Sequence, residues 1–201
     1  SRATVRQAMA LLENQGLVDR SQGRGTFVGR PKFSNDLMQL FSPMRGMTGQ
    51  RTPPKLVVDD LSLVRPPSYV ATRLNLAADE MVYELKRRLV VDNEPLMIIY
   101  NWLSATRFPA LEDAFKGEQT IYGVLVNHYN IGRAAQRKEV EVTILDEEEA
   151  AKLETRVGAP ALLITYVTFL PEGDAIEFRR LTVRGDRVRY YVDQDEAEFL
   201  V

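Results

Sequence analysis

The chain has 201 residues, of which 45% are apolar and 27% charged, and its formal net charge is −2. This content supports two modules, and the sequence contains neither the ~18-residue apolar run of a membrane-spanning helix nor a signal peptide. The lack of cysteine excludes disulfides, thiol catalysis and cysteine metal sites, and the single histidine, His128, is expected on a helix surface. We therefore expect a cytoplasmic protein that uses no metal and no cofactor.

Residues 2–15 are predicted to form an amphipathic helix. Ser1 is placed to cap its start, and Gly16 stands where a left-handed residue ends many helices. One side then packs while basic and polar side chains occupy the others. The apolar side is formed by Val5, Ala8, Met9 and Leu12.

A β-hairpin is predicted next, from residues 17–20 and 26–28 around the turn Gly23-Arg24-Gly25. Residues 1–32 hold six Lys or Arg and two Asp or Glu, a net charge of +4 (6 − 2) in a chain that is acidic overall. Basic charge concentrated in this way favours contact with phosphate, and hence with DNA.

Together, helix and hairpin resemble the winged helix of the GntR family of bacterial transcription regulators, whose pattern S-R-x-T-V-R, G-L-V-x-R, G-x-G-T-F-V matches residues 1–28 almost completely. The resemblance implies that the helix start enters the major groove and that the hairpin forms the wing. An ordinary surface helix with solvated arginines is the alternative, and a phosphate-cradling glycine loop is a weaker one. The implied DNA-binding residues are Ser1, Arg2, Thr4, Arg6, Gln22, Gly23 and Arg24.

The family's DNA-binding domain has two further helices before this one, and the chain starts at the third without an initiator methionine. We therefore expect the sequence to be part of a longer protein. Without those helices the recognition helix loses its packing partners, so this chain alone is expected to bind DNA poorly.

Residues 29–35 are predicted to be a linker because Gly29 and Pro31 end the wing strand. Residues 36–201 then read as one α+β domain built on an antiparallel sheet. The hairpin signal at residues 92–95 and the capping-box spacing at residues 146–149 are its clearest local features. Strands are expected near residues 55–65, 81–91, 96–103, 139–145, 161–170, 175–184 and 187–192, and helices near residues 66–74, 109–115, 120–129 and 146–155.

This order of elements resembles the UTRA effector-binding domain of the HutC subfamily, which shares its fold with chorismate lyase. The resemblance covers most of residues 36–193. The residues that carry the resemblance occur in the family's order. They are Leu76 with Asp79-Glu80 before Val82-Tyr83, Arg87 ahead of the 92–95 hairpin, Thr120-Ile121-Tyr122 with Leu125 and Tyr129, residues 158–163, and Glu177 followed by Arg184-Gly185-Asp186.

In such domains the effector lies against the sheet. By resemblance Arg87 pairs with an anion, the helix start at Thr120 and Tyr122 offers amides to it, and Glu177 accepts a hydroxyl or amine of the ligand. Two alternatives stay open: Arg87 as an ordinary surface ion pair, and Tyr122 as a core residue. The implied effector-binding residues are Phe41, Ser42, Arg87, Thr120, Tyr122 and Glu177. Leu89, Ile99 and Val183 are further site positions, at which this chain differs from the family pattern.

These three differences from the family pattern make the predicted site less charged. Sensors of phosphorylated amino sugars tend to have Arg-x-Arg on this strand, with both guanidinium groups on one face, whereas here Arg87 is followed by Leu89 and Arg88 lies on the opposite face. Ile99 replaces a frequent acidic residue and Val183 a frequent aromatic one. We expect an effector with one anionic group and an apolar or aromatic body instead of a sugar phosphate.

The predicted function is a ligand-responsive repressor that binds a pseudo-palindromic operator as a homodimer and is not an enzyme. A constitutive DNA-binding protein whose second domain only dimerises is one alternative. A chorismate-lyase-like enzyme is a weaker one, because fold kinship is poor support for activity and the chain shows no acid–base pair or nucleophile of a known type.

Overall fold

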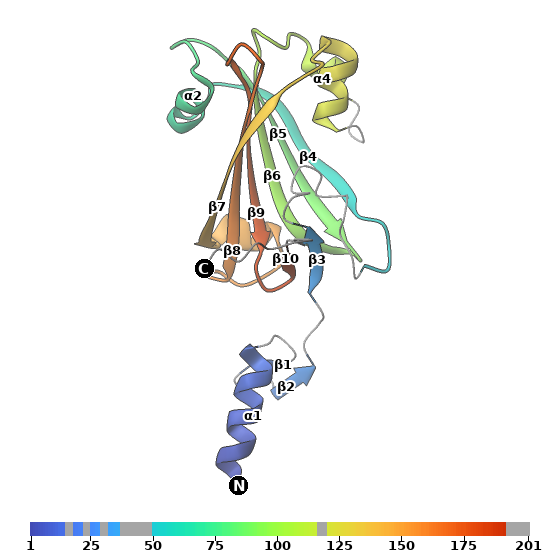
Figure 1. The fold of residues 1–201 in the computed structure, drawn as a ribbon, viewed down its shortest axis with the longest axis vertical. Coiled ribbons are helices and arrows are strands. Elements are labelled where there is room, and N and C mark those ends of the chain that lie inside the picture. Colours follow the sequence, from blue (N-terminus) through green and yellow to red (C-terminus); the bar gives the residue numbers. More distant parts are fainter. Residues whose placement is uncertain (15–17, 22–24, 29–31, 37–49, 116–119, 192–201) are drawn as a thin grey trace, which may run out of the picture. The chain divides into compact units, whose positions relative to one another are not determined.

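The computed structural model describes the chain except for residues 15–17, 22–24, 29–31, 37–49, 116–119 and 192–201. It divides into two compact units, residues 1–52 with 185–201 and residues 53–184 (Figure 1). Each unit has its own secondary structure and is taken separately below.

The first unit begins with α1 (Arg2–Asn14) and the antiparallel hairpin of β1 (Val18–Ser21) and β2 (Gly25–Val28), so the predicted helix and hairpin are present. The Ser1 hydroxyl accepts a hydrogen bond from the Thr4 amide at 3.4 Å, as expected of a helix cap. The apolar side of the helix is not fully buried, since Val5 is exposed.

The predicted linker 29–35 is wrong at its end. β3 (Phe33–Asp36) is a strand that pairs in parallel with β10 (Val188–Tyr191). The Lys32 ammonium donates to the Gly185 carbonyl at 2.7 Å and reinforces this pair. A four-residue strand whose partner lies more than 150 residues away leaves no local periodic signal, which is why the sequence did not reveal it.

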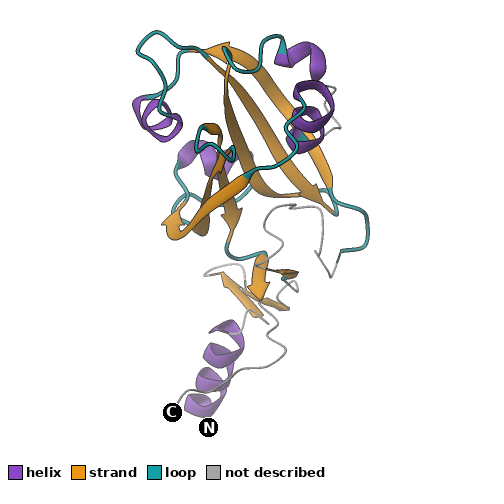
Figure 2. Ribbon diagram, turned by 45° about the horizontal axis from the view of Figure 1, so that its top comes forward, coloured by secondary structure: helices purple, strands orange, loops and turns teal. Residues whose placement is uncertain are grey.

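The second unit is an α+β domain around a six-stranded antiparallel sheet in the order β4-β5-β6-β9-β8-β7, with helices on both sides (Figure 2). Each of the six strands lies where the sequence predicted one. Their bounds are β4 (Lys55–Val64), β5 (Val82–Val91), β6 (Glu94–Ser104), β7 (Ala135–Ile144), β8 (Pro160–Phe169) and β9 (Ala175–Arg184).

Three hydrophobic clusters attach helices to the two faces of this sheet. α3 (Leu111–Ala114) and α4 (Ile121–Tyr129) pack on the face that carries Tyr83, Leu85 and Leu103. The opposite face receives α2 (Ser68–Leu74) over Trp102 and Phe178, and α5 (Glu147–Lys152) over Ile98. The sheet therefore has a helix-covered core on each side.

The hairpin between β5 and β6 turns at Asp92 and Asn93, whose φ angles are 50° and 65°. Positive φ at both turn residues is the requirement of a type I′ turn, which Asp and Asn meet at lower cost than most residues. The turn follows directly from the sequence signal at residues 92–95.

One predicted burial pattern is wrong. The alternating Val140, Val142 and Ile144 were expected to form a half-buried strand, but all three are exposed, Val142 by 84%. β7 is an edge strand of the sheet, and alternation reports only that side chains share a face, not that another element covers the face.

Candidate functional site

The candidate effector site lies on the face of the central sheet that carries Arg87. Alternate residues of a strand share a face, and residues paired in register across antiparallel strands lie on the same side. Arg87 is paired with Ile99, Ile99 with Leu181 and Leu181 with Ile164, so all four share that side. The "Arg87 face" is defined by Arg87 and Leu89 of β5, Met97, Ile99 and Asn101 of β6, Glu177, Arg179, Leu181 and Val183 of β9, Ile164, Tyr166 and Thr168 of β8, and Gln136 and Lys138 of β7.

Arg87 is deeply buried, with 4% of its surface exposed. Its Nη2 donates to the Asn101 Oδ1 at 2.7 Å, whereas its Nε has no hydrogen-bond partner. Burial lowers the pKa of Arg87 to about 10, the positive charge of Arg179 adds to this, and Glu177 opposes it. The alternative of a surface ion pair is therefore wrong, and a buried cation with a free donor remains.

Glu177 lies in the same cluster and is also buried. Its carboxylate accepts hydrogen bonds from Asn101 at 2.5 Å, from Thr168 at 3.0 Å and from Arg179 at 3.1 Å. Burial raises the pKa of this carboxyl, but the charge of Arg179 and these hydrogen bonds outweigh it and hold the pKa below its usual range. Glu177 lies on the Arg87 face, and both of its carboxylate oxygens already accept hydrogen bonds from protein groups, which leaves little room for its predicted role as an acceptor for the ligand.

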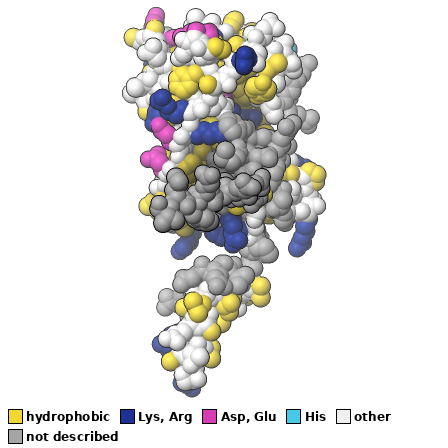
Figure 3. Space-filling model, viewed as in Figure 1, with side chains coloured by type: hydrophobic (Ala, Val, Ile, Leu, Met, Phe, Trp, Pro, Cys, Tyr) yellow, Lys and Arg dark blue, Asp and Glu magenta, His cyan; other side chains and the backbone are white. Residues whose placement is uncertain are grey.

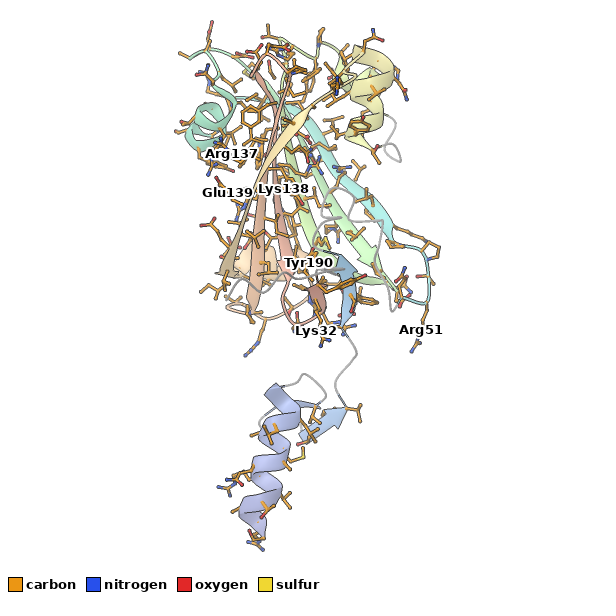
Figure 4. All side chains as sticks on the ribbon, viewed as in Figure 1. Lys32, Arg51, Arg137, Lys138, Glu139 and Tyr190 are labelled. Atoms are coloured by element: carbon orange, nitrogen blue, oxygen red, sulfur yellow. The ribbon has the colours of Figure 1, made fainter. Side chains whose placement is uncertain are left out.

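The face holds a second arginine, largely but not fully buried, that the sequence analysis missed. Arg179 enters from β9, forms an ion pair with Glu177 and stacks over the ring of Tyr166 with 5.2 Å from Cζ to the ring centroid. Lys138, labelled on β7 in Figure 4, approaches the same ring with its Nζ 5.6 Å from the centroid. The absence of Arg-x-Arg on β5 therefore does not leave Arg87 as the one cation of this face.

The three apolar residues that differ from the family pattern lie on the Arg87 face, as strand parity predicted for Leu89 and the family resemblance implied for Ile99 and Val183. Leu89, Ile99 and Val183 are buried there. Arg88, by contrast, is on the opposite face and forms a bidentate ion pair with Asp59 at 2.7 to 3.0 Å. The face thus combines a polar cluster with an apolar floor.

The helix start of α4 is organised by Thr120, whose hydroxyl accepts from the Gly123 amide at 3.1 Å. Tyr122 is 63% exposed, so the alternative of a core residue is wrong. Among the described residues, no hydrogen bond joins either side chain to Arg87. Phe41 and Ser42 lie outside the described residues.

The predicted DNA-binding residues fall partly within the structure. Ser1, Arg2, Thr4 and Arg6 are exposed at the start of α1. In Figure 3 this helix is at the lower end of the view, and Lys or Arg side chains, in dark blue, show on its surface. Gln22, Gly23 and Arg24 lie outside the described residues. His128 is exposed on α4, as expected from the sequence.

Asn101, Thr168, Arg179 and Tyr166 were not named from the sequence, although a signal for two of them was present. Asn101 stands two residues after Ile99 and Arg179 two residues after Glu177, so strand alternation alone puts each on the face of a named residue. Thr168 and Tyr166 required the pairing of β8 with β9, which is a long-range fact.

The described residues contain no group of three or more His, Cys, Asp or Glu side chains arranged to hold a metal ion. Their helices are all too short or too polar to cross a membrane.

Residues 50–189 match the family model of the UTRA domain. The HTH-type transcriptional repressor NagR of Bacillus subtilis (strain 168) is 30% identical over 196 residues, which are 96% of this chain and 80% of that protein. The HTH-type transcriptional repressor PhnF of Mycolicibacterium smegmatis is 28% identical over 190 residues, covering 94% of this chain and 77% of that protein. Both alignments extend over the helix and hairpin as well as the sheet domain.

Solved structures agree with these relatives. The crystal structure of PhnF from Mycobacterium smegmatis superposes with a TM-score of 0.68 at 26% identity, covering 98% of this chain and 86% of that one. The C-terminal domain of YurK from Bacillus subtilis superposes with a TM-score of 0.65 at 20% identity, covering 68% of this chain and 94% of that one, and supports the fold alone.

Proposed function

The chain belongs to the UTRA-domain family of GntR-type transcription regulators, and we propose that it is a repressor whose affinity for operator DNA is controlled by a small molecule bound on the Arg87 face. Its relatives NagR and PhnF are named repressors. A protein of this kind acts in the cytoplasm, where its operator is.

The observation that carries the effector proposal is the unpartnered Nε of Arg87. A buried donor without an acceptor is costly, and a guanidinium costs more because its charge is desolvated as well. An anionic group of the effector would supply both the acceptor and the opposite charge. Asn101 orients the guanidinium for it by accepting from Nη2 at 2.7 Å.

We propose further that the rest of the effector is apolar or aromatic. Leu89, Ile99 and Val183 are buried on the same face and offer no hydrogen bonds to sugar hydroxyls. The effector would therefore be an acid with an apolar body, in contrast to a phosphorylated sugar.

A thermal-denaturation screen tests this with alkanoic acids, aromatic acids, amino acids and sugar phosphates. An effector at one hundred times its Kd raises the unfolding free energy by about 2.7 kcal/mol. Arg87→Met is expected to abolish the shift, while Arg88→Met, the same replacement on the opposite face, leaves it unchanged. A shift with sugar phosphates alone contradicts the apolar body, and no shift with any compound favours the constitutive, dimerisation-only alternative.

For DNA binding we propose a winged helix made by residues 1–28, joined to an effector-binding and dimerisation domain that starts near residue 36. The exposed Arg2 and Arg6 on α1 support contact with the major groove and backbone. Ser1, Thr4, Gln22, Gly23 and Arg24 complete the proposed contact set. A homodimer would place two such helices about one DNA turn, ~34 Å, apart.

Salt dependence of binding to a random-sequence duplex, followed by fluorescence anisotropy, tests the proposed contacts. Each phosphate-contacting arginine that is removed reduces the magnitude of the negative slope of log K against log salt by about 0.9. Arg6→Gln and Arg24→Gln are expected to do so, whereas Arg156→Gln, an exposed arginine of the sheet domain, is not. Equal slopes for all variants would contradict the proposed contacts.

A further inference from the structure

A continuous chain of side-chain hydrogen bonds crosses the Arg87 face from β5 to β7. Arg87 donates to Asn101, and Asn101 donates to Glu177. On the other side, Thr168 also bonds Glu177, and Gln136 bonds Thr168 at 3.1 Å. Five consecutive strands of the sheet are thereby joined through one buried carboxylate.

The direction of every bond in this chain is determined by Glu177. Its ionised carboxylate can only accept, so the Thr168 hydroxyl must give its single proton to it. Thr168 then acts only as an acceptor toward Gln136, which must present its Nε2 to the hydroxyl. The amide oxygen of Gln136 consequently points away from this network of hydrogen bonds.

Each end of this hydrogen-bond network has one atom without a partner. At the β5 end the Nε of Arg87 has no acceptor, and at the β7 end the Oε1 of Gln136 has no donor, although both atoms are buried. Buried polar atoms are normally hydrogen-bonded, and an unpaired one requires an explanation. Here the two are of opposite kinds, one a cationic donor and one a neutral acceptor, and they lie on one face.

We propose that the effector is bifunctional, with an anionic group at Arg87 and a hydroxyl, amine or amide donor at its far end that bonds Gln136. Gln136, not Glu177, is then the residue that selects the donor, because the Glu177 oxygens are occupied by Arg179, Asn101 and Thr168. This assignment rests on the proposed function, since it takes the Arg87 face as the effector site.

The position of the two ends sets the shape of the effector. Four strand spacings separate β5 from β7, about 19 Å along the sheet. Arg87 and Gln136 both lean inward, toward Asn101 and Thr168, which shortens the distance to be spanned. The effector is therefore elongated. Asn101, Arg179 and Tyr166 lie in the row of side chains between its two ends, and the apolar Ile99, Leu181 and Ile164 lie in the adjacent row, level with Arg87.

Matched pairs of acids test the inference directly. Alkanoates and their ω-hydroxy derivatives of roughly 8 to 12 carbons cover the distance between the two ends. By isothermal titration, the wild-type chain is expected to bind the best ω-hydroxyalkanoate about five- to tenfold more tightly than the unsubstituted acid of equal length. Gln136→Leu is expected to remove that preference while keeping the affinity for the plain alkanoate.

Two further variants make the outcome unambiguous. Thr143→Val, a replacement on β7 whose residue lies on the opposite face, is expected to keep the preference. Arg87→Met is expected to lose both acids. Because the preference is a ratio measured on one protein sample, and Gln136→Ala provides a second deletion of the amide, a folding defect cannot imitate the predicted result.

Failure of the proposed role of Gln136 and failure of the proposed anion site give different results. Equal affinity of the wild type for both acids, or a preference that survives Gln136→Leu and Gln136→Ala, overturns the role of Gln136 and leaves the proposed anion site standing. If the wild type binds neither acid, or if Arg87→Met binds them as well as the wild type does, the anion site itself is wrong and the inference falls with it.

Discussion

At the scale of single residues, Glu177 determines how the polar cluster on the sheet is arranged. It is a buried carboxylate that accepts hydrogen bonds from Arg179, Asn101 and Thr168. A buried ion pair adds little net stability compared with apolar packing, but removal of one partner is expensive. Its main effect is to orient the donors and acceptors that face a ligand.

Glu177→Gln is therefore expected to destabilise the domain by about 3 kcal/mol, because the largely buried Arg179 is left without an opposite charge. Urea denaturation followed by circular dichroism measures the change. Glu172→Gln, an exposed glutamate in the turn before β9, serves as the control and is expected to stay within about 0.5 kcal/mol of the wild type. A similar small effect at Glu177 would show that its ion pair is not energetically important.

The same residue predicts a pH dependence. Because the folded-state pKa of Glu177 lies below its ordinary value of about 4.3, its stabilising contribution is complete above that pH. The contribution declines as the pH falls below about 4.3 and is lost once the pH passes below the folded-state pKa. The difference in unfolding free energy between wild type and Glu177→Gln, measured from pH 7 downward, should shrink in that acidic range, and a difference independent of pH would contradict it.

At the scale of elements, α5 shows how a short helix is held by its first residue. The Asp146 carboxylate accepts from the Glu149 amide at 2.8 Å, and the Glu149 carboxylate accepts in return from the Asp146 amide, which completes a capping box. Glu149 also pairs with Arg180 and Thr182 of β9 at 3.0 Å. The cap thus fixes a residue that connects helix and sheet.

Asp146→Ala is expected to lower the unfolding free energy by about 1 kcal/mol, whereas Asp146→Asn, which keeps a capping oxygen, loses less than half of that. Chemical denaturation of the three proteins under identical conditions measures the series. Equal losses for Ala and Asn would mean that the charge of Asp146, and not its cap, stabilises the helix.

Elements also differ in the protection that the sheet gives them. β6 lies between β5 and β9 in the middle of the sheet, whereas β3 has β10 as its one paired strand among the described residues, through four residues. Native-state hydrogen exchange should therefore find the slowest amides in β6 and much faster exchange in β3. Comparable protection of the two strands would show that β3 is held by more than this short pair.

At the scale of the whole molecule, control of DNA binding requires that the effector and the operator favour different states of a dimer. If the effector weakens operator binding by some factor, the operator must weaken effector binding by the same factor. β9 carries Glu177, Arg179 and Val183, and the chain runs from its end into β10, the partner of β3. The strand that carries these proposed effector-binding residues is thus close in sequence to β10, which pairs with β3.

The proposed homodimer predicts a mass of about 45.6 kDa (2 × 22.8 kDa) by light scattering coupled to size-exclusion chromatography. The symmetry of a pseudo-palindromic operator is the physical reason for two copies. A mass of 22.8 kDa that does not change over a hundredfold range of concentration would contradict the dimer.

Local patterns in the sequence were sufficient to predict the class of fold and the positions of the six sheet strands. They also predicted the cap of α1, the turn at Asp92 and Asn93, and the capping box of α5. Each depends on residues within a few positions of one another, whose backbone preferences and side-chain hydrogen bonds act locally. Strand parity also assigned Arg87 and Leu89 to one face and Arg88 to the other, whereas Ile99 and Val183 were placed beside them by the family resemblance.

The pairing of β3 with β10, the exposure of β7 and the saturation of Glu177 depended on the tertiary structure alone. Burial and hydrogen-bond partners are set by segments far apart in the chain: Glu177 meets Asn101 from a strand that precedes it by 76 positions. Only when β5, β6, β9, β8 and β7 lie side by side does a chain of donors with two open ends exist, and that juxtaposition determines which groups are left for a ligand.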